Sequence, residues 1–204
     1  MPADHREALA LAFALDTISS LFGSPLVTDV LVVTSDPVVA RRLRRLGVRV
    51  IPDQGAGLGQ AIHGGVRVAA TWRPGTGIAV VPADLPCLRA AGVTQVVTDG
   101  SATEGAFVPD RSGTGTTLVI YPPGRRALTR YGPGSAAGHR ALDLHPLHDA
   151  PMRARHDVDT LEDLAAATSL GDETRIIAHP LDLALDRCAN LGAGGLTPRW
   201  RPTR

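Results

Sequence analysis

The chain contains no lysine, because all 21 of its basic residues are arginine, and they face 20 acidic residues. A lysine ammonium therefore cannot serve as a phosphate ligand anywhere in the sequence. The net charge of +1 comes without a dense arginine block, and aromatic residues make up only 3% of the chain. A basic surface for duplex DNA and stacking platforms for single-stranded bases are both missing, so we expect no nucleic-acid partner.

Cysteines and long apolar runs are also scarce. Cys87 and Cys188 stand far apart, which predicts neither a thiolate metal site nor a disulfide framework and fits a reducing compartment. No apolar run approaches the ~18 residues of a membrane span. Asp4, Arg6 and Glu7 interrupt any signal-peptide core at the start of the sequence. We expect a cytoplasmic protein that does not associate with membranes.

The length and composition favour one folded unit. With 204 residues, of which 44% are hydrophobic, the chain can bury a sizeable core. We assign residues 1–178 to a single domain. Glycine, proline and arginine dominate the end of the chain, so we expect residues 179–204 to form a mobile tail.

Helical and strand patterns alternate along the first half of the chain. Leu11, Leu15, Ile18 and Phe22 recur at helical spacing, and short runs of β-branched residues follow. The expected strands are 30–33, 48–51 and 77–81. The first expected helix ends near residue 24, and the second is capped at Ser35-Asp36-Pro37 and ends at about Leu46. A third helix follows the Gly-rich turn at 55–59, and a fourth spans about 87–98. This alternation predicts an α/β fold with a doubly wound, mostly parallel sheet, in which strands 30–33 and 77–81 are buried on both faces.

The pattern changes after Gly105. Strand-like segments at 106–108 and 116–121 are separated by glycine and proline turns, which predicts an antiparallel edge on the sheet. Short helices are expected at about 135–142 and 161–167.

Three aspartates are candidate metal ligands. Asp84 directly follows an expected strand, at the edge where open α/β sheets bind ligands, although an aspartate before a proline also suits a turn or a helix cap. Asp157 and Asp159 are two residues apart, so on an extended segment both carboxylates point the same way, as a shared Mg²⁺ or Mn²⁺ requires. Such a pair arises about once by chance in a chain of this composition. Asp159 or Thr160 could instead cap the following helix.

Two loops have the composition of anion cradles. Residues 113–117 (GTGTT) precede a strand and residues 131–137 (YGPGSAA) open a helix, so small residues, hydroxyls and free backbone N–H groups come together. Either loop alone is also an ordinary turn. Arg111 and Arg140 flank the loops and could clamp a phosphate, or simply be solvated. The seven histidines show no metal-ligand spacing, so we interpret them as structural or surface residues.

Taken in order, several segments resemble the guanylyltransferases of deazaflavin coenzyme F-420 biosynthesis, which activate 2-phospho-L-lactate or phosphoenolpyruvate. The resemblance extends over about residues 3 to 176. The segments that carry it are 7–17 (EALALAFALDT), 52–62 (PDQGAGLGQAI), 82–86 (PADLP), 110–116 (DRSGTGT), 131–137 (YGPGSAA) with His139 and Arg140, and 157–164 (DVDTLEDL). The family has a fold similar to other α/β nucleotidyltransferases, including the molybdenum-cofactor guanylyltransferases.

The resemblance implies roles for individual residues. Asp84, Asp157 and Asp159 match the family's Mg²⁺ ligands and catalytic centre. Thr116, Gly132 and Ser135 match its site for the phosphorylated three-carbon acid, and Gly57 lies in the segment that matches its nucleotide site. The implied reaction is attack of the acid's phosphate on the α-phosphorus of GTP with release of pyrophosphate, for which no protein nucleophile is needed. The implied partners are GTP and the acid, and a homodimer is a possible assembly.

The sequence departs from the family pattern in two places. The family begins with a strand and a lysine-containing loop that cradles the GTP phosphates, and the given sequence starts after the matching position. That strand is central in the family's sheet, so we expect either a rearranged sheet or neighbouring strands with unpaired backbone groups. Gly59 stands where the family has an asparagine near the nucleotide, which removes one reason to expect selectivity for guanine.

Three functional hypotheses follow. The first is a Mg²⁺-dependent guanylyltransferase in a chain that has further residues upstream. The composition, with arginine as its only basic residue, resembles that of actinobacterial chains, and this resemblance favours phosphoenolpyruvate over 2-phospho-L-lactate as acceptor. The second is a non-catalytic homologue that binds a phosphorylated metabolite or a partner enzyme. The third is a nucleotidyltransferase for another acceptor, such as a sugar phosphate or molybdopterin.

Overall fold

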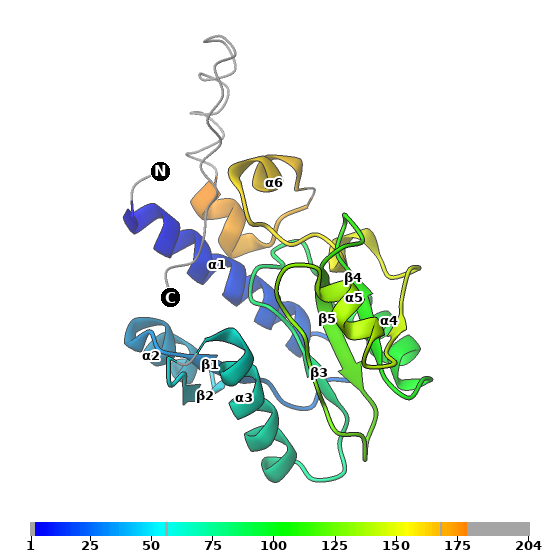
Figure 1. Cartoon of the computed structure of the whole chain (residues 1–204). Coiled ribbons are helices and arrows are strands. Elements are labelled where there is room, and N and C mark those ends of the chain that lie inside the picture. The colour runs from blue at the N-terminus through cyan, green and yellow to red at the C-terminus, as the bar shows by residue number, and fades with distance from the viewer. Residues whose placement is uncertain (1–2, 56, 168, 179–204) are drawn as a thin grey trace.

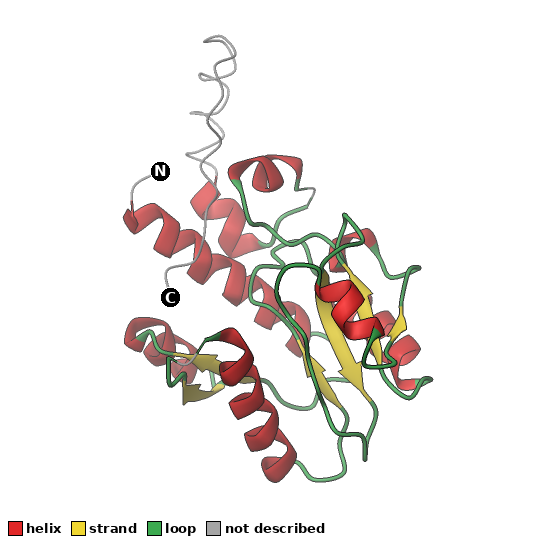
Figure 2. Ribbon diagram, in the orientation of Figure 1, coloured by secondary structure: helices red, strands yellow, loops and turns green. Residues whose placement is uncertain are grey.

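A computed structural model describes residues 3–55, 57–167 and 169–178, in which helices surround two groups of strands (Figures 1 and 2). The helices are α1 (Ala3–Phe22), α2 (Pro37–Arg45), α3 (Leu58–Trp72), α4 (Ala90–Ser101), α5 (Ser135–Arg140), the 3-10 helix η1 (Met152–Ala154) and α6 (Leu161–Ala166). The strands are β1 (Leu31–Thr34), β2 (Arg49–Pro52), β3 (Ile78–Val80), β4 (Ala106–Pro109), β5 (Thr116–Tyr121) and β6 (His145–Pro146). Residues 172–178 are also helical. The sequence thus predicted the main elements in the right order.

The strands form two separate sheets. β1 and β2 pair in parallel, and the other sheet has the order β3-β5-β4-β6. β5 runs antiparallel to both β3 and β4, whereas β4 and β6 are parallel. The α/β class and the antiparallel pairing after Gly105 are confirmed, but the prediction that this pairing forms the edge of the sheet is wrong, because β5 lies inside its sheet. All six residues of β5 are buried, as expected for a strand that is paired on both sides.

The gap between the two sheets lies between strands β1 and β3. Within the described residues neither strand has a pairing partner on its remaining side, and α3 packs against both of them. The contact with β1 is close, since a Cβ added to Gly65 of α3 would lie 2.9 Å from Val33 Cγ2. β1 is half-buried throughout, and Ala79 in β3 is exposed. The prediction that both strands are buried on two faces is therefore wrong, and the alternative of neighbouring strands with unpaired edges is confirmed.

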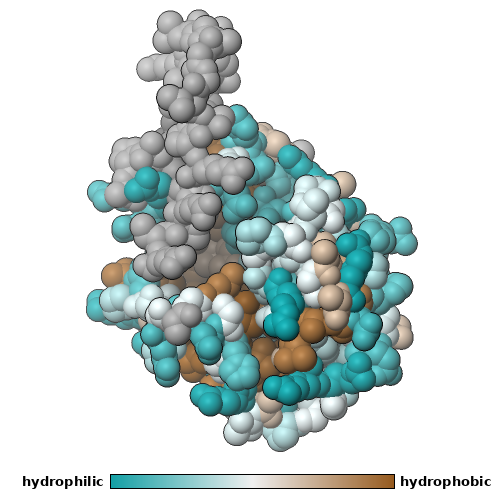
Figure 3. Space-filling view, viewed as in Figure 1, coloured by the Kyte–Doolittle hydropathy of each residue, from teal (hydrophilic) through white to brown (hydrophobic). Residues whose placement is uncertain are grey.

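Apolar residues reach the surface near this separation. In Figure 3 a hydrophobic area occupies the part of the view where Figure 1 shows β1, α3 and β3. The half-buried residues Val32, Val33, Val66 and Val80 belong to these three elements. The chain thus exposes apolar surface where a continuous sheet would bury it.

The main core lies between the four-stranded sheet and α4. Val93 and Val96 of α4 are fully buried against residues of β4 and β5, which include Val108 and Leu118. On the other face of this sheet, Phe107 and Val119 pack with Ala136 of α5. This packing holds the ends of β4 and β5 rigidly, and the loops described below begin there.

Asp16 of α1 connects the two ends of the described chain. Its buried carboxylate accepts hydrogen bonds from the backbone N–H groups of Glu173 and Thr174, at 3.1 and 2.8 Å. These are orphan donors at the start of helix 172–178, so Asp16 caps a helix that lies about 155 residues further along the chain. Gly171 permits the contact, because a Cβ there would lie 2.0 Å from Asp16 Cγ.

Two helices, α2 and α6, begin with the side-chain caps that the sequence predicts. Asp36 caps α2 by accepting from the N–H groups of Val38 and Val39. Thr160 and Asp163 form a reciprocal capping box at the start of α6, which decides between the two candidate caps in favour of Thr160. The predicted tail, residues 179–204, lies outside the described residues, so the domain boundary stays a prediction. No helix in the described part of the chain is both long and apolar enough to cross a membrane.

Candidate functional site

Asp84 lies four residues beyond the end of β3. Its Oδ1 atom is shielded from solvent and has no hydrogen-bond partner among the described residues. Burial, and then the negative charges of Asp157 and Asp159, raise the pKa of the Asp84 carboxyl to about 7. A shielded carboxylate oxygen without a donor, next to two further carboxylates, is electrostatically unfavourable unless a cation or a proton is bound.

The aspartate pair at 157 and 159 is held against Asp84 by the backbone. The N–H of Val158 donates to the carbonyl of Asp84 at 3.1 Å, and the Val158 side chain is buried. Asp157 is half-buried and Asp159 is exposed, on a segment that belongs to no helix or strand. Burial, with a smaller contribution from the negative charge of Asp159, raises the pKa of Asp157 to about 6. The structure thus brings together the three aspartates that the sequence suggested as metal ligands.

A cavity of about 180 Å³ opens at this segment. It is lined mainly by acidic side chains and carries one arginine: Asp110, Arg111, Ser112, His156, Asp157, Asp159 and Asp163. Arg111 lies 4.0 Å from Asp163 and is half-exposed. The segments 110–116 and 157–164, which both belong to the set that carries the family resemblance, therefore contribute to one cavity.

The loop after β4 is ordered by Asp110. Its carboxylate accepts from Ser112 Oγ and from the N–H of Thr114, while its own N–H donates to the carbonyl of Gly115. A Cβ at Gly115 would lie 2.5 Å from Asp110 Oδ2, so the loop requires glycine there. Asp110 therefore serves to shape the loop.

The residues predicted to bind the acid gather around α5. Ser135 begins this helix and is buried, and Thr116 at the start of β5 is 8% exposed. The two loops are joined because Ala136 N–H donates to the carbonyl of Thr114 at 3.1 Å. Gly132 has a φ of 131°, a conformation that strongly favours glycine. Thr116, Gly132 and Ser135 are thus neighbours through this loop pairing.

Tyr131 links the loop before α5 to the aspartates. Its hydroxyl donates to the carbonyl of Val80, the last residue of β3, at 3.0 Å. Burial, with a further contribution from the negative charge of Asp84, raises the pKa of Tyr131 above its usual range, so the phenol stays protonated. Thr117 makes a second connection, because its Oγ1 donates to the carbonyl of Ala154, just before the 156–159 segment.

The three aspartates are of the ligand type that Mg²⁺ prefers, but they do not form a complete coordination shell by themselves. No group of three or more potential ligand side chains in the described residues is arranged to enclose a metal ion. Mg²⁺ in proteins is commonly held by one or two carboxylates together with substrate phosphates and water. The unpartnered Oδ1 of Asp84 and the raised pKa of Asp157 fit such an ion.

Gly57, the predicted nucleotide-binding residue, lies elsewhere. It precedes α3 in the loop that follows β2, with a φ of 89°, and it is exposed. It does not line the acidic cavity. Its part in nucleotide binding stays a prediction.

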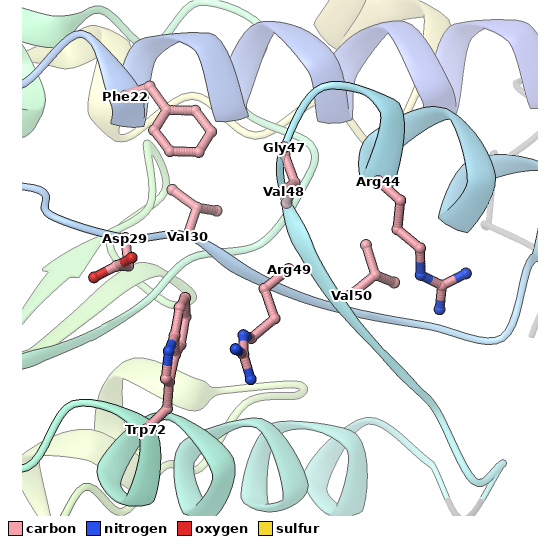
Figure 4. Close-up of a pocket in the computed structure, with 9 residues that line it drawn as sticks. All are labelled: Phe22, Asp29, Val30, Arg44, Gly47, Val48, Arg49, Val50 and Trp72. Carbon is pink, nitrogen blue, oxygen red and sulfur yellow. The ribbon is translucent and has the colours of Figure 1, made fainter.

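A second cavity, of about 420 Å³, lies at the amino ends of β1 and β2. Asp29 and Val30 precede β1 and Gly47 and Val48 precede β2, so this cavity is at the amino ends of the strands (Figure 4). The Arg49 guanidinium stacks on Trp72, 4.0 Å from the ring centre. Ligands of open α/β sheets bind at the carboxyl ends, so we assign the chemistry to the smaller acidic cavity.

Sequence reasoning missed Asp163, Tyr131 and the functional environment of His139. Asp163 was expected only within the helix at 161–167, yet it also lines the cavity. Its position four residues after Asp159 in the same acidic segment is a usable signal. Tyr131 and His139 belonged to segments that carried the family resemblance, but their hydrogen bonds join parts of the chain that no local pattern connects.

Comparison with known proteins gives three consistent results. Residues 9–179 match the family model of the MobA-like NTP transferase domain. The phosphoenolpyruvate guanylyltransferase of Salinispora arenicola is 44% identical over 84% of this chain and 79% of its own length, and that of Streptomyces avermitilis is 42% identical over 85% and 81%. Among solved structures, a protein from Desulfovibrio desulfuricans G20 described as a nucleotide-diphospho-sugar transferase has a TM-score of 0.62 at 16% identity, over 88% of this chain and 84% of its own, which supports the fold alone.

Proposed function

The chain belongs to the MobA-like NTP transferase family, and on that basis we propose that it transfers GMP from GTP to phosphoenolpyruvate, with 2-phospho-L-lactate as the alternative acceptor. A nucleotidyltransferase of this kind would work in the cytoplasm, in the synthesis of coenzyme F-420. The observation that supports it most directly is the connection, through Tyr131, of a cluster of aspartates to a loop rich in hydroxyl and backbone donors.

For this reaction the protein must position the two substrates and compensate the negative charge of their phosphates. An oxygen of the acid's phosphate attacks the α-phosphorus of GTP, the bond from this phosphorus to the oxygen bridging to the β-phosphorus breaks, and the electron pair leaves with pyrophosphate. We assign Asp84, Asp157 and Asp159 to holding Mg²⁺. When bound, the ion neutralises phosphate charge in the transition state.

The acid is held by groups that donate hydrogen bonds. We assign Thr116, Gly132 and Ser135 to its phosphate and carboxylate, because the start of α5 and the hydroxyl of Thr116 lie beside one another. Both ends of the substrate are anionic, and such donors are effective where water is excluded. Arg111 at the rim of the acidic cavity would balance charge on the nucleotide.

The experiment is an assay of pyrophosphate release by the purified chain with GTP, Mg²⁺ and each acid separately, with mass spectrometry of the nucleotide product. A guanylylated acid is the expected product and would identify the acceptor. Release of pyrophosphate with ATP or CTP but not GTP would contradict the base assignment. Binding of phosphoenolpyruvate without any transfer, in a chain extended upstream as well, would favour a non-catalytic binding protein.

A further inference from the structure

His139 is completely buried in the middle of the proposed acid site. It belongs to α5, and its ring lies 5.7 Å from that of Phe107 and 5.2 Å, edge-on, from that of Tyr131. Both ring nitrogens have hydrogen-bond partners. Nε2 is 2.9 Å from the backbone nitrogen of Arg130, and Nδ1 is 2.9 Å from Thr116 Oγ1.

These two bonds determine which nitrogen carries the proton. A backbone N–H can only donate, so Nε2 must accept and therefore has no hydrogen. In a neutral ring the hydrogen is then on Nδ1, and it is donated to Thr116 Oγ1. Burial lowers the pKa of His139 to about 4, so the ring remains neutral near pH 7.

The orientation of the Thr116 hydroxyl follows from the tautomer. Its oxygen accepts from His139, so its own hydrogen must be donated elsewhere. Thr116 Oγ1 has no second hydrogen-bond partner among the described residues. An anion at this position would complete the chain Arg130 N–H to His139 to Thr116 to ligand, in which every group donates in the same direction.

We propose that His139 is a positioning residue that fixes the Thr116 hydroxyl as a hydrogen-bond donor to the phosphorylated acid. The inference rests on the proposed function and extends it, because it explains how a neutral hydroxyl is made selective for an anion. With the opposite tautomer, the same hydroxyl would donate to His139 and present lone pairs to the ligand, which an anion repels. His139 acts through Thr116 and does not itself touch the acid.

The tautomer can be measured without any enzymatic activity. In a long-range proton–nitrogen NMR spectrum of the full chain labelled with ¹⁵N-histidine, His139 should show a protonated Nδ1 and an unprotonated Nε2 at pH 7. Titration with phosphoenolpyruvate, GTP being absent, should shift the His139 signals while the exposed His63 and His148 stay unchanged. A protonated Nε2, or no shift at saturating acid, would overturn the inference.

Substitutions of His139 then distinguish a positioning role from a purely structural one. His139→Asn retains a donor near Nδ1, whereas His139→Gln retains a group near Nε2 and loses that donor. We expect His139→Gln to raise the KM for phosphoenolpyruvate by about tenfold, the effect of one lost hydrogen bond to a charged group, with the KM for GTP unchanged. His139→Asn should recover most of the loss, and Thr116→Val combined with His139→Gln should be no worse than Thr116→Val alone.

Failure of the inference differs from failure of the proposed function. If the wild-type chain transfers GMP but His139→Gln folds and keeps the wild-type KM for the acid, the positioning role is wrong and the function stands. If the wild-type chain transfers nothing, also when extended upstream, the function fails, and the NMR titration still decides whether the acid binds at Thr116 beside His139.

Discussion

The backbone N–H of Val158 donates to the carbonyl of Asp84 across 3.1 Å, and this bond brings together two acidic segments that are 74 positions apart in the sequence. It fixes Asp157 and Asp159 on either side of a buried valine, next to a carboxylate whose Oδ1 has no hydrogen-bond donor. The acidic centre is therefore a product of the fold, and its roles can be tested residue by residue.

Asp84→Asn and Asp157→Asn should each reduce kcat by at least about 100-fold, because a neutral amide compensates the Mg²⁺ charge poorly. The measurement is Mg²⁺-dependent pyrophosphate release in a folded variant. Asp99→Asn is the matched control, since Asp99 is an exposed residue of α4 remote from the cavity lining. Retained activity in Asp84→Asn would refute the metal assignment.

The same carboxylate makes a prediction about stability and pH. The pKa of Asp84 rises from 3.8 to about 7 on folding, so between these values the folded chain binds more protons than the unfolded chain. Stability should accordingly fall as pH rises through this window. Without metal, Asp84→Asn should increase the free energy of unfolding by roughly 1–3 kcal/mol at pH 8 and change it little at pH 4. Urea titrations at the two pH values provide the measurement. An equal change in the free energy of unfolding at both pH values would contradict the idea that the ionised Asp84 carboxylate is the destabilising form.

Two arginines distinguish the two cavities. Arg111→Ala should lower kcat/KM by about tenfold, because a charge-assisted contact near the substrate phosphates is lost. Arg49→Ala, which removes the guanidinium stacked on Trp72 in the larger cavity, should leave kcat/KM within about twofold. Steady-state kinetics of both variants test whether the acidic cavity is the reaction site. The reverse order of effects would move the site to the other end of the strands.

Gly171→Ala should destabilise the chain by roughly 2–4 kcal/mol, since the new Cβ would overlap the Asp16 carboxylate that caps helix 172–178. Gly64→Ala is the control, because Gly64 lies inside α3 with open space around it. That substitution should stabilise by about 0.5–1 kcal/mol. Thermal unfolding of both variants gives the comparison, and a Gly171→Ala protein as stable as wild type would show that Asp16 can cap the helix from another position.

The sequence was sufficient to predict the order and type of the main elements, because each depends on local signals: helical spacing in α1, the Asp36 cap, and the capping box at Thr160. It did not predict β6, η1 or helix 172–178. It predicted antiparallel strands after Gly105, but it could not predict that β5 lies inside its sheet. The apolar pattern of a buried strand does not report which strands lie beside it. The half-burial of β1 was equally unpredictable, since it depends on whether β3 pairs beside it.

The sequence indicated the candidate metal ligands but not the hydrogen bonds that hold the site together. Asp84 follows an expected strand, and Asp157 and Asp159 are two residues apart, so both features can be recognised in the sequence alone. The hydrogen bonds that give Tyr131 and His139 their places link residues 51 and 23 positions away. Such contacts follow from tertiary packing, and no periodicity in the sequence reports them.

The separation of the two sheets has a consequence for handling the protein. The open side of β1 presents Leu31, Val32, Val33 and Thr34, with no charge or proline among them, and β3 is likewise uncharged. Natural proteins usually protect such edges, because unpaired strands are templates for pairing between molecules. Aggregation during concentration or refolding should therefore begin at these two edges. A charged residue in place of the exposed Ala79 should improve solubility without changing the acidic centre.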